Sequence, residues 1–135
     1  MEDDGRHPFP VEQPQPKPCV FIHGLFGWGE QTPLWGAAPL YFPLDEIRKA
    51  RPHGVTVAVA VGVNSSNHDR ACEAFAQLYG LQTDYGEQHS IQCGHAQYGT
   101  DYTESGLLDC EWDEDHPVHI IGHSFGGNTA LALVS

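Results

Sequence analysis

The sequence is poor in basic residues and has no long apolar segment. Only 6 Lys and Arg stand against 18 Asp and Glu in 135 residues, giving a formal net charge of −12. Nucleic acids and anionic membranes are bound through clustered cations, so this charge balance argues against both as partners. No apolar run approaches the roughly 18 residues that a transmembrane helix needs. The length is that of one domain, able to bury a core.

Cysteine pairs and targeting signals are also lacking. The four cysteines form no C-x-x-C pair, and their spacing suggests no disulfide framework. The first ten residues, acidic and rich in proline, have neither the basic nor the apolar region of a secretory signal peptide. The first ten residues therefore do not indicate the cellular compartment of the protein. Residues 1–18 are predicted to form a disordered, proline-rich leader ahead of a domain over residues 19–135.

Apolar patterning predicts alternating strands and helices. Short apolar or β-branched runs predict buried strands over residues 19–22, 55–61 and 118–121. Helices are expected over residues 45–50, from Asp69 to a stop at Gly80, and over residues 128–135. Residues 81–117 show no clear period. The alternation favours an α/β fold with a mostly parallel sheet, in which the last strand lies at an edge.

The residues GHSFG match G-x-S-x-G, the nucleophile elbow of α/β-hydrolases. The five-residue pattern is weak alone, but an apolar strand precedes it and a helical pattern follows it. In so tight a turn, side chains two residues either side of the serine would collide, which accounts for Gly122 and Gly126. Ser124 is therefore predicted to be a catalytic nucleophile at the carboxyl end of its strand.

Acyl transfer also needs two N–H donors for the negatively charged oxygen of the transition state. One is the amide of the residue after the nucleophile, here Phe125. The other comes from a loop that follows an earlier strand. A His-Gly pair directly after the strand at residues 19–22 opens such a loop, which assigns the second donor to Leu25.

Two other classes of protein compete with this interpretation. A Gly-rich turn between strand and helix also binds phosphate, but neither G-x-G-x-x-G nor Gly-Lys-Ser/Thr is present. A non-catalytic binding protein on the same fold is the stronger alternative. The triad acid and base follow the serine in hydrolase order, yet no Asp, Glu or His follows Ser124. We expect a hydrolase truncated after its elbow, with little or no esterase turnover alone.

Four longer segments give a more specific match. They are FIHGLFGWG, AVAVGVNSSNHDRACEAFAQLYG, TDYGEQHSIQCGHAQYG and VHIIGHSFGGNTALALVS. Across residues 19–135 they resemble the N-terminal half of the thermoalkalophilic, zinc-containing lipases of bacillary and staphylococcal bacteria. The resemblance implies an enzyme that hydrolyses lipid esters, chiefly triacylglycerols, through a serine acyl-enzyme. It assigns the nucleophile to Ser124 and the oxyanion donors to Leu25 and Phe125. Members of that family are secreted.

The resemblance also implies a structural zinc ion in a metal-binding insertion around residues 64–99. Its ligands would be Asp69, His89 and His95, and the family's fourth ligand, an Asp, lies beyond this chain. So do the triad Asp and His and a calcium site. Four residues depart from the family. Leu25 stands where it usually has an aromatic residue and Phe125 where it has Gln, but both would act through backbone N–H groups. His68 stands where it has Trp, and Cys93 stands where some members have a further His. The oligomeric state is left open.

Overall fold

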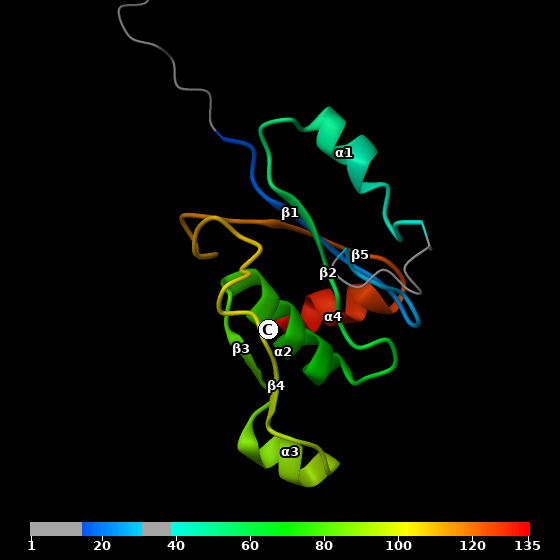
Figure 1. The fold of residues 1–135 in the computed structure, drawn as a ribbon, viewed down its shortest axis with the longest axis vertical. Coiled ribbons are helices and arrows are strands. Elements are labelled where there is room, and N and C mark those ends of the chain that lie inside the picture. The colour runs from blue at the N-terminus through cyan, green and yellow to red at the C-terminus, as the bar shows by residue number, and fades with distance from the viewer. Residues whose placement is uncertain (1–14, 31–38) are drawn as a thin grey trace, which may run out of the picture.

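The computed structural model describes residues 15–30 and 39–135 (Figure 1). Its elements, in chain order, are β1 (Cys19–Ile22), α1 (Leu44–Ala50), β2 (Thr56–Val59), α2 (Asn67–Tyr79), β3 (Gln82–Asp84), α3 (Glu87–Cys93), β4 (Tyr98–Asp101), β5 (His119–Gly122) and α4 (Phe125–Leu133). Most of the predicted leader, residues 1–14, falls outside the described residues. No helix in the described ranges is both long and apolar enough to span a membrane.

Three parallel strands in the order β2-β1-β5 form the central sheet. Cys19 pairs with Thr56 on one side and with His119 on the other, so the strands begin in register. The predicted parallel sheet is confirmed, and β5 lies at an edge of it, as expected. Figure 1 shows α1 on one side of these strands and α2 with α4 on the other. The buried core includes Val20, Ile22 and Val59.

Helix α2 illustrates how local chemistry sets the element boundaries. The Ser66 side chain accepts a hydrogen bond from the Asp69 amide at 3.1 Å and caps the first turn. Gly80 ends the helix in the left-handed region, with φ of 68°, where a side chain would be strained. The predicted stop at Gly80 is confirmed, and the helix begins two residues before Asp69.

The segment without a clear period contains a small second sheet. Strands β3 and β4 pair antiparallel with an irregular register, and α3 lies between them in the chain. Only Ser90 is buried in α3, and β4 buries none of its residues. Because few positions of this lobe face a core, its residues show no apolar periodicity. The lobe occupies the lower end of the molecule in Figure 1.

Candidate functional site

Ser124 lies in the turn between β5 and α4 with a rare backbone conformation. Its φ of 56° and ψ of −125° lie where few residues other than glycine are found. The side chain is exposed at the carboxyl end of the sheet. Such strain at a strand-to-helix turn is the geometry of a nucleophile elbow, which presents the serine hydroxyl to solvent.

The glycines on either side of Ser124 are required by close backbone contacts. A Cβ on Gly122 would lie 2.4 Å from the backbone of Gly126. A Cβ on Gly126 would lie 2.1 Å from the carbonyl oxygen of Ile22 in β1. Both distances are too short for any side chain, so glycine at position 122 lets α4 pack closely against β5, and glycine at position 126 lets it pack closely against β1.

The loop after β1 lies directly against the elbow. A Cβ on Gly24 would be 3.0 Å from the Cβ of Ser124. Leu25 follows Gly24 directly, so its segment of the loop lies next to the elbow. Across the described residues, no acceptor is hydrogen-bonded to the amide of Leu25 or of Phe125. Neither amide is thus hydrogen-bonded to another described residue, a condition that an oxyanion donor must meet.

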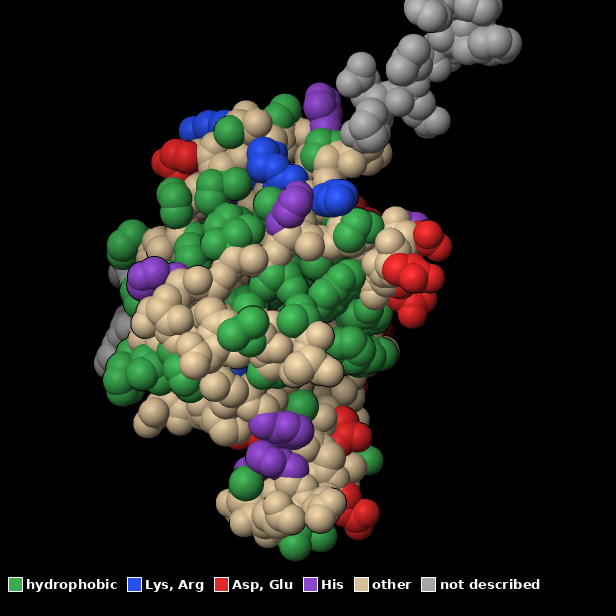
Figure 2. Space-filling model, turned by 180° about the vertical axis from the view of Figure 1, so that it is seen from behind, with side chains coloured by type: hydrophobic (Ala, Val, Ile, Leu, Met, Phe, Trp, Pro, Cys, Tyr) green, Lys and Arg blue, Asp and Glu red, His purple; other side chains and the backbone are tan. Residues whose placement is uncertain are grey.

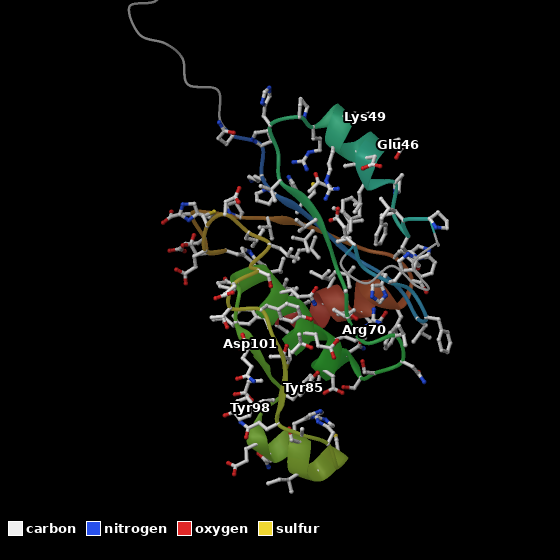
Figure 3. All side chains as sticks on the ribbon, viewed as in Figure 1. Glu46, Lys49, Arg70, Tyr85, Tyr98 and Asp101 are labelled. Carbon is white, nitrogen blue, oxygen red and sulfur yellow. The ribbon has the colours of Figure 1, made fainter. Side chains whose placement is uncertain are left out.

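A buried arginine joins the parts of this site. Arg70, labelled on α2 in Figure 3, is fully buried. Its guanidinium donates hydrogen bonds to the His23 carbonyl, to the Gly62 carbonyl at 2.6 Å and to Thr129 Oγ1 of α4 at 2.9 Å. It also lies 5.3 Å from the ring centroid of Phe125. Burial lowers the pKa of Arg70 from its ordinary value. The sequence patterns did not single out this residue, because an isolated charge on a helix normally faces water.

Two further side chains fix the loop after β1. His23 is buried, donates from Nδ1 to the Gly24 carbonyl and accepts at Nε2 from the Val61 amide at 3.1 Å. Burial lowers the pKa of His23, which keeps the ring neutral. The Tyr41 hydroxyl lies 2.6 Å from Nδ1 of His123 and accepts from the Gly24 amide at 3.3 Å. Tyr41 therefore bridges the two loops that flank Ser124, a role that no sequence motif indicated.

Neither nearby histidine is placed to activate the serine. His23 uses both ring nitrogens on backbone groups, and Nδ1 of His123 contacts Tyr41. No hydrogen bond between described residues involves the Ser124 hydroxyl. Among the described residues, no histidine is therefore hydrogen-bonded to the residue predicted to be the nucleophile.

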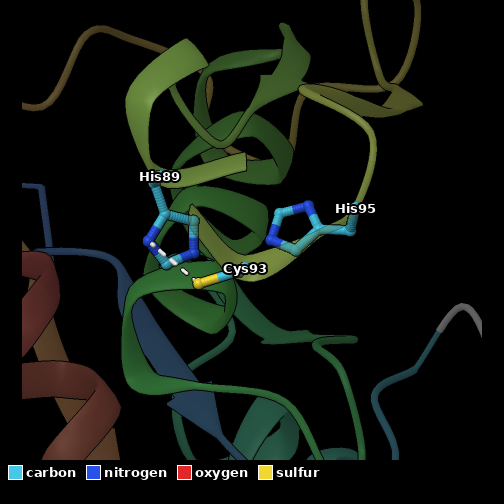
Figure 4. A group of neighbouring side chains, drawn as sticks. All are labelled: His89, Cys93 and His95. Atoms are coloured by element: carbon cyan, nitrogen blue, oxygen red, sulfur yellow. Dashed lines mark hydrogen bonds between the residues drawn. The ribbon is translucent and has the colours of Figure 1, made fainter. Parts of the chain in front are cut away.

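A second cluster of functional groups lies where α2 meets the lobe. Asp69 in the first turn of α2 has Oδ1 2.8 Å from His89 Nε2 and 3.7 Å from His95 Nε2. His68 stacks on His89 with ring centroids 4.0 Å apart. Figure 2 shows histidine side chains gathered where the lower end of the molecule joins the rest. One donor atom from each of His89, Cys93 and His95 lies within 4.8 Å of the others (Figure 4). The predicted ligand residues are thus brought together, and the nitrogen and carboxylate donors are of the kind that zinc accepts.

Tyr85 holds the lobe against α2. Its hydroxyl donates to Glu73 of α2 at 2.9 Å, and its ring packs edge-on against His95 with centroids 5.2 Å apart (Figure 3). Burial and the Glu73 carboxylate raise the pKa of Tyr85, so the hydroxyl stays protonated and remains a donor. The ring that packs against His95 is therefore fixed to α2 by a hydrogen bond.

Comparison with known proteins places these features in context. A family model described as "Lipase-like, C-terminal domain" matches residues 15–134. The lipase of Staphylococcus hyicus is 40% identical over 128 residues, which cover 90% of this chain and 19% of that protein. Lipase 2 of Staphylococcus aureus is 36% identical over 132 residues, covering 90% of this chain and 18% of that protein.

Solved structures of related proteins also match most of this chain. The crystal structure of Staphylococcus hyicus lipase matches with a TM-score of 0.73 and 36% identity, over 87% of this chain and 30% of that one. EstA from Clostridium botulinum matches with a TM-score of 0.71 and 37% identity, over 84% of this chain and 26% of that one. The chain therefore spans less than a third of each of these four relatives.

Proposed function

The chain belongs to the family of lipase-like C-terminal domains, and on that premise we propose that it carries the nucleophile and oxyanion donors of a serine ester hydrolase acting on triacylglycerols. One observation carries the proposal: Ser124 sits exposed and strained between β5 and α4, beside the loop after β1. The relatives' names support a lipase, because the proteins of Staphylococcus hyicus and Staphylococcus aureus are both called lipases.

The proposed reaction follows from this placement. Oγ of Ser124 attacks the ester carbonyl carbon and gives up its proton to a general base, while the carbonyl oxygen takes the negative charge. The amides of Leu25 and Phe125 donate to that oxygen. The alcohol then leaves with a proton, and water releases the fatty acid from the serine ester. The acid and the base of the triad are proposed to follow Ser135, in hydrolase order.

We propose that the 135 residues alone turn over ester slowly or not at all, since their hydroxyl lacks a base. A non-catalytic binding module is the alternative, and the absence of a histidine hydrogen-bonded to Ser124 among the described residues favours it. The sequence of the mature transcript beyond Ser135 separates the two. An Asp followed by a His in frame supports the enzyme, whereas a stop codon supports the module.

Labelling with a fluorophosphonate tests the serine directly. The full gene product should react once per molecule, and the Ser124→Ala variant should not. Ser105→Ala is the matched control, because Ser105 is also exposed but bonds only to its own turn. Labelling that persists in Ser124→Ala would refute the assignment of the nucleophile, and an unreactive wild type would favour the binding module.

We further propose that Asp69, His89 and His95 bind a structural zinc ion, as the family resemblance implies. Support comes from the convergence of their donor atoms where α2 meets the lobe. Zinc when bound would tie the lobe to α2; nothing places it near Ser124. Equilibrium dialysis of a His89→Ala, His95→Ala double variant is the test. Unchanged zinc uptake would contradict the assignment. The family's calcium site would be formed by residues beyond this chain.

A further inference from the structure

The hydroxyl of Tyr41 lies where the loop after β1 meets the elbow. It is 2.6 Å from Nδ1 of His123 and accepts a hydrogen bond from the Gly24 amide at 3.3 Å. A Cβ on Gly24 would lie 3.0 Å from the Cβ of Ser124 and 3.2 Å from this hydroxyl. The hydroxyl thus contacts both the residue before Ser124 and the residue before Leu25.

The two hydrogen bonds of this hydroxyl assign the position of its proton. The Gly24 amide can only donate, so it binds a lone pair of the hydroxyl oxygen. Among the described residues, Nδ1 of His123 is the one acceptor to which the hydroxyl is hydrogen-bonded. Tyr41 therefore donates to Nδ1, and in the neutral ring of His123 the proton is on Nε2. One side chain thus accepts from one loop and donates to the other.

Packing holds the ring of Tyr41 in place independently of its hydroxyl. The ring packs edge-on against Trp28 with centroids 5.3 Å apart, and against the ring of His123 with centroids 5.6 Å apart. A Cβ on Gly27 would lie 2.8 Å from Cε2 of Tyr41, so glycine lets the loop after β1 close around the ring. A Tyr41→Phe variant should therefore keep the ring in position and remove only the two hydrogen bonds.

The two proposed oxyanion donors, Leu25 and Phe125, lie on separate loops. Among the described residues, no direct hydrogen bond joins residues 24–27 to residues 123–126. Tyr41 makes that connection through one side chain. Two donors stabilise an oxyanion only if both reach the same oxygen atom at once, so their separation must be fixed before the reaction. The bridge through Tyr41 is placed to fix it.

We propose that Tyr41 is a positioning residue for ester hydrolysis, whose hydroxyl sets the separation of the Leu25 and Phe125 amides. This inference rests on the proposed function, because it assigns a role within that oxyanion hole. Tyr41 acts through Gly24 and His123 and takes part in no bond change. Because the amides bind a charged oxygen only in the transition state, loss of the bridge should lower kcat and leave KM for a small soluble ester unchanged.

Tyr41→Phe in the full gene product tests the bridge, with p-nitrophenyl butyrate as a soluble ester. Its kcat should fall roughly 10–100-fold, less than the loss of a whole oxyanion donor would cost, with KM unchanged. Tyr79→Phe is the matched control, because the Tyr79 hydroxyl also donates to one distant group, the carbonyl of Trp112. Tyr79→Phe should lower the melting temperature about as much as Tyr41→Phe does, with kcat unchanged.

His123 supplies the other side of a double-mutant cycle. His123→Ala removes the acceptor of the bridge, so it should slow turnover as Tyr41→Phe does. Because both variants break one bridge, the double variant should be about as slow as either single variant. His123→Asn offers an amide oxygen near the position of Nδ1 and should recover most of the kcat that His123→Ala loses. Circular dichroism checks that each variant is folded.

Amide NMR of the 135-residue chain gives a readout that does not depend on turnover. In Tyr41→Phe the signals of Gly24, Leu25 and Phe125 should all shift, because both loops lose their common partner. The same signals should stay in place in Tyr79→Phe. A shift confined to Gly24 and Leu25 would overturn the inference, because the hydroxyl would then order only its own side of the site.

The kinetic outcomes separate this inference from the proposed function. A wild-type product that fluorophosphonate does not label would overturn both. A labelled wild type with an unchanged kcat in Tyr41→Phe, or with a raised KM alone, would overturn the positioning role and leave the nucleophile standing. Losses of kcat that multiply in the double variant would also overturn it, because the two side chains would then act separately.

Discussion

Replacing the adjacent glycines Gly126 and Gly127 of α4 by alanine should change the stability of the fold in opposite directions. In Gly126→Ala the new Cβ would meet the Ile22 carbonyl oxygen at 2.1 Å and the His23 carbonyl oxygen at 2.8 Å. The Ile22 oxygen is itself fixed, because it accepts from the His123 amide at 3.0 Å. The helix must therefore retreat from β1 by about 1 Å, and overpacking of this kind costs about 3 kcal/mol.

Gly127→Ala is the matched control one residue along. Its nearest contact is the Gly122 carbonyl oxygen at 4.0 Å, which is ordinary packing distance. Alanine there gains helix propensity and reduces the entropy of the unfolded chain, which together stabilise by about 0.5–1 kcal/mol. The two variants should thus differ by about 3–4 kcal/mol, a large part of the roughly 5–15 kcal/mol by which a domain is stable.

Circular dichroism melting of the two variants and wild type provides the assay. At about 3–5 °C per kcal/mol, Gly126→Ala should melt roughly 10 °C below wild type, and Gly127→Ala a few degrees above it. Urea titrations should give the same order. Melting temperatures within about 2 °C of each other would refute the reasoning that space, rather than glycine's flexibility, fixes position 126.

Three further predictions concern residues at or around the elbow. Arg70→Met should lower the free energy of unfolding by about 2–4 kcal/mol, because buried carbonyl groups lose their hydrogen-bond donor. The control Arg51→Met, at a more exposed arginine, should lower it by less than about 1 kcal/mol. Equal losses in urea unfolding would contradict this prediction. Burial lowers the pKa of His23 in the folded state. As pH drops through about 6.5, the histidine is therefore protonated in the unfolded chain but not yet in the folded one, and the free energy of unfolding should fall. Urea unfolding on both sides of that pH should show a weaker dependence in His23→Gln, and an identical dependence would exclude His23 as the cause. Ser124→Gly should raise the melting temperature. Glycine relieves about 1–3 kcal/mol of backbone strain at this position, which exceeds its entropic cost of roughly 0.5–1 kcal/mol. A lower melting temperature would mean that Ser124 is not strained.

The sequence predicted the sheet and the elbow because both leave strong local signals. The β-branched run around β2 is buried along its whole length, and G-x-S-x-G is a steric requirement of its turn. Helix α4 begins at Phe125, three residues earlier than predicted, because Gly126 and Gly127 read as turn rather than helix. The elements of the lobe were missed because almost none of their residues are buried.

The supporting residues of the site could not be found in the same way. Arg70 is recognisable only once β1, α2 and α4 are assembled, because its hydrogen-bond partners come from three separate segments. Tyr41 is likewise separated by 82 residues from His123. Motifs report which groups do the chemistry, whereas the groups that hold them in place are defined by contacts between distant parts of the chain.

Asp69 and Arg70 are neighbours in the sequence, yet one reaches the histidine cluster and the other the loops around Ser124. Both belong to the first turn of α2, which the Ser66 side chain caps. Helix ends fray, and loss of such a cap costs about 1 kcal/mol. Fraying of this single turn would release both residues in one event. Amide hydrogen exchange at the cluster and at the elbow should therefore follow one shared opening equilibrium, although no side chain runs from one to the other.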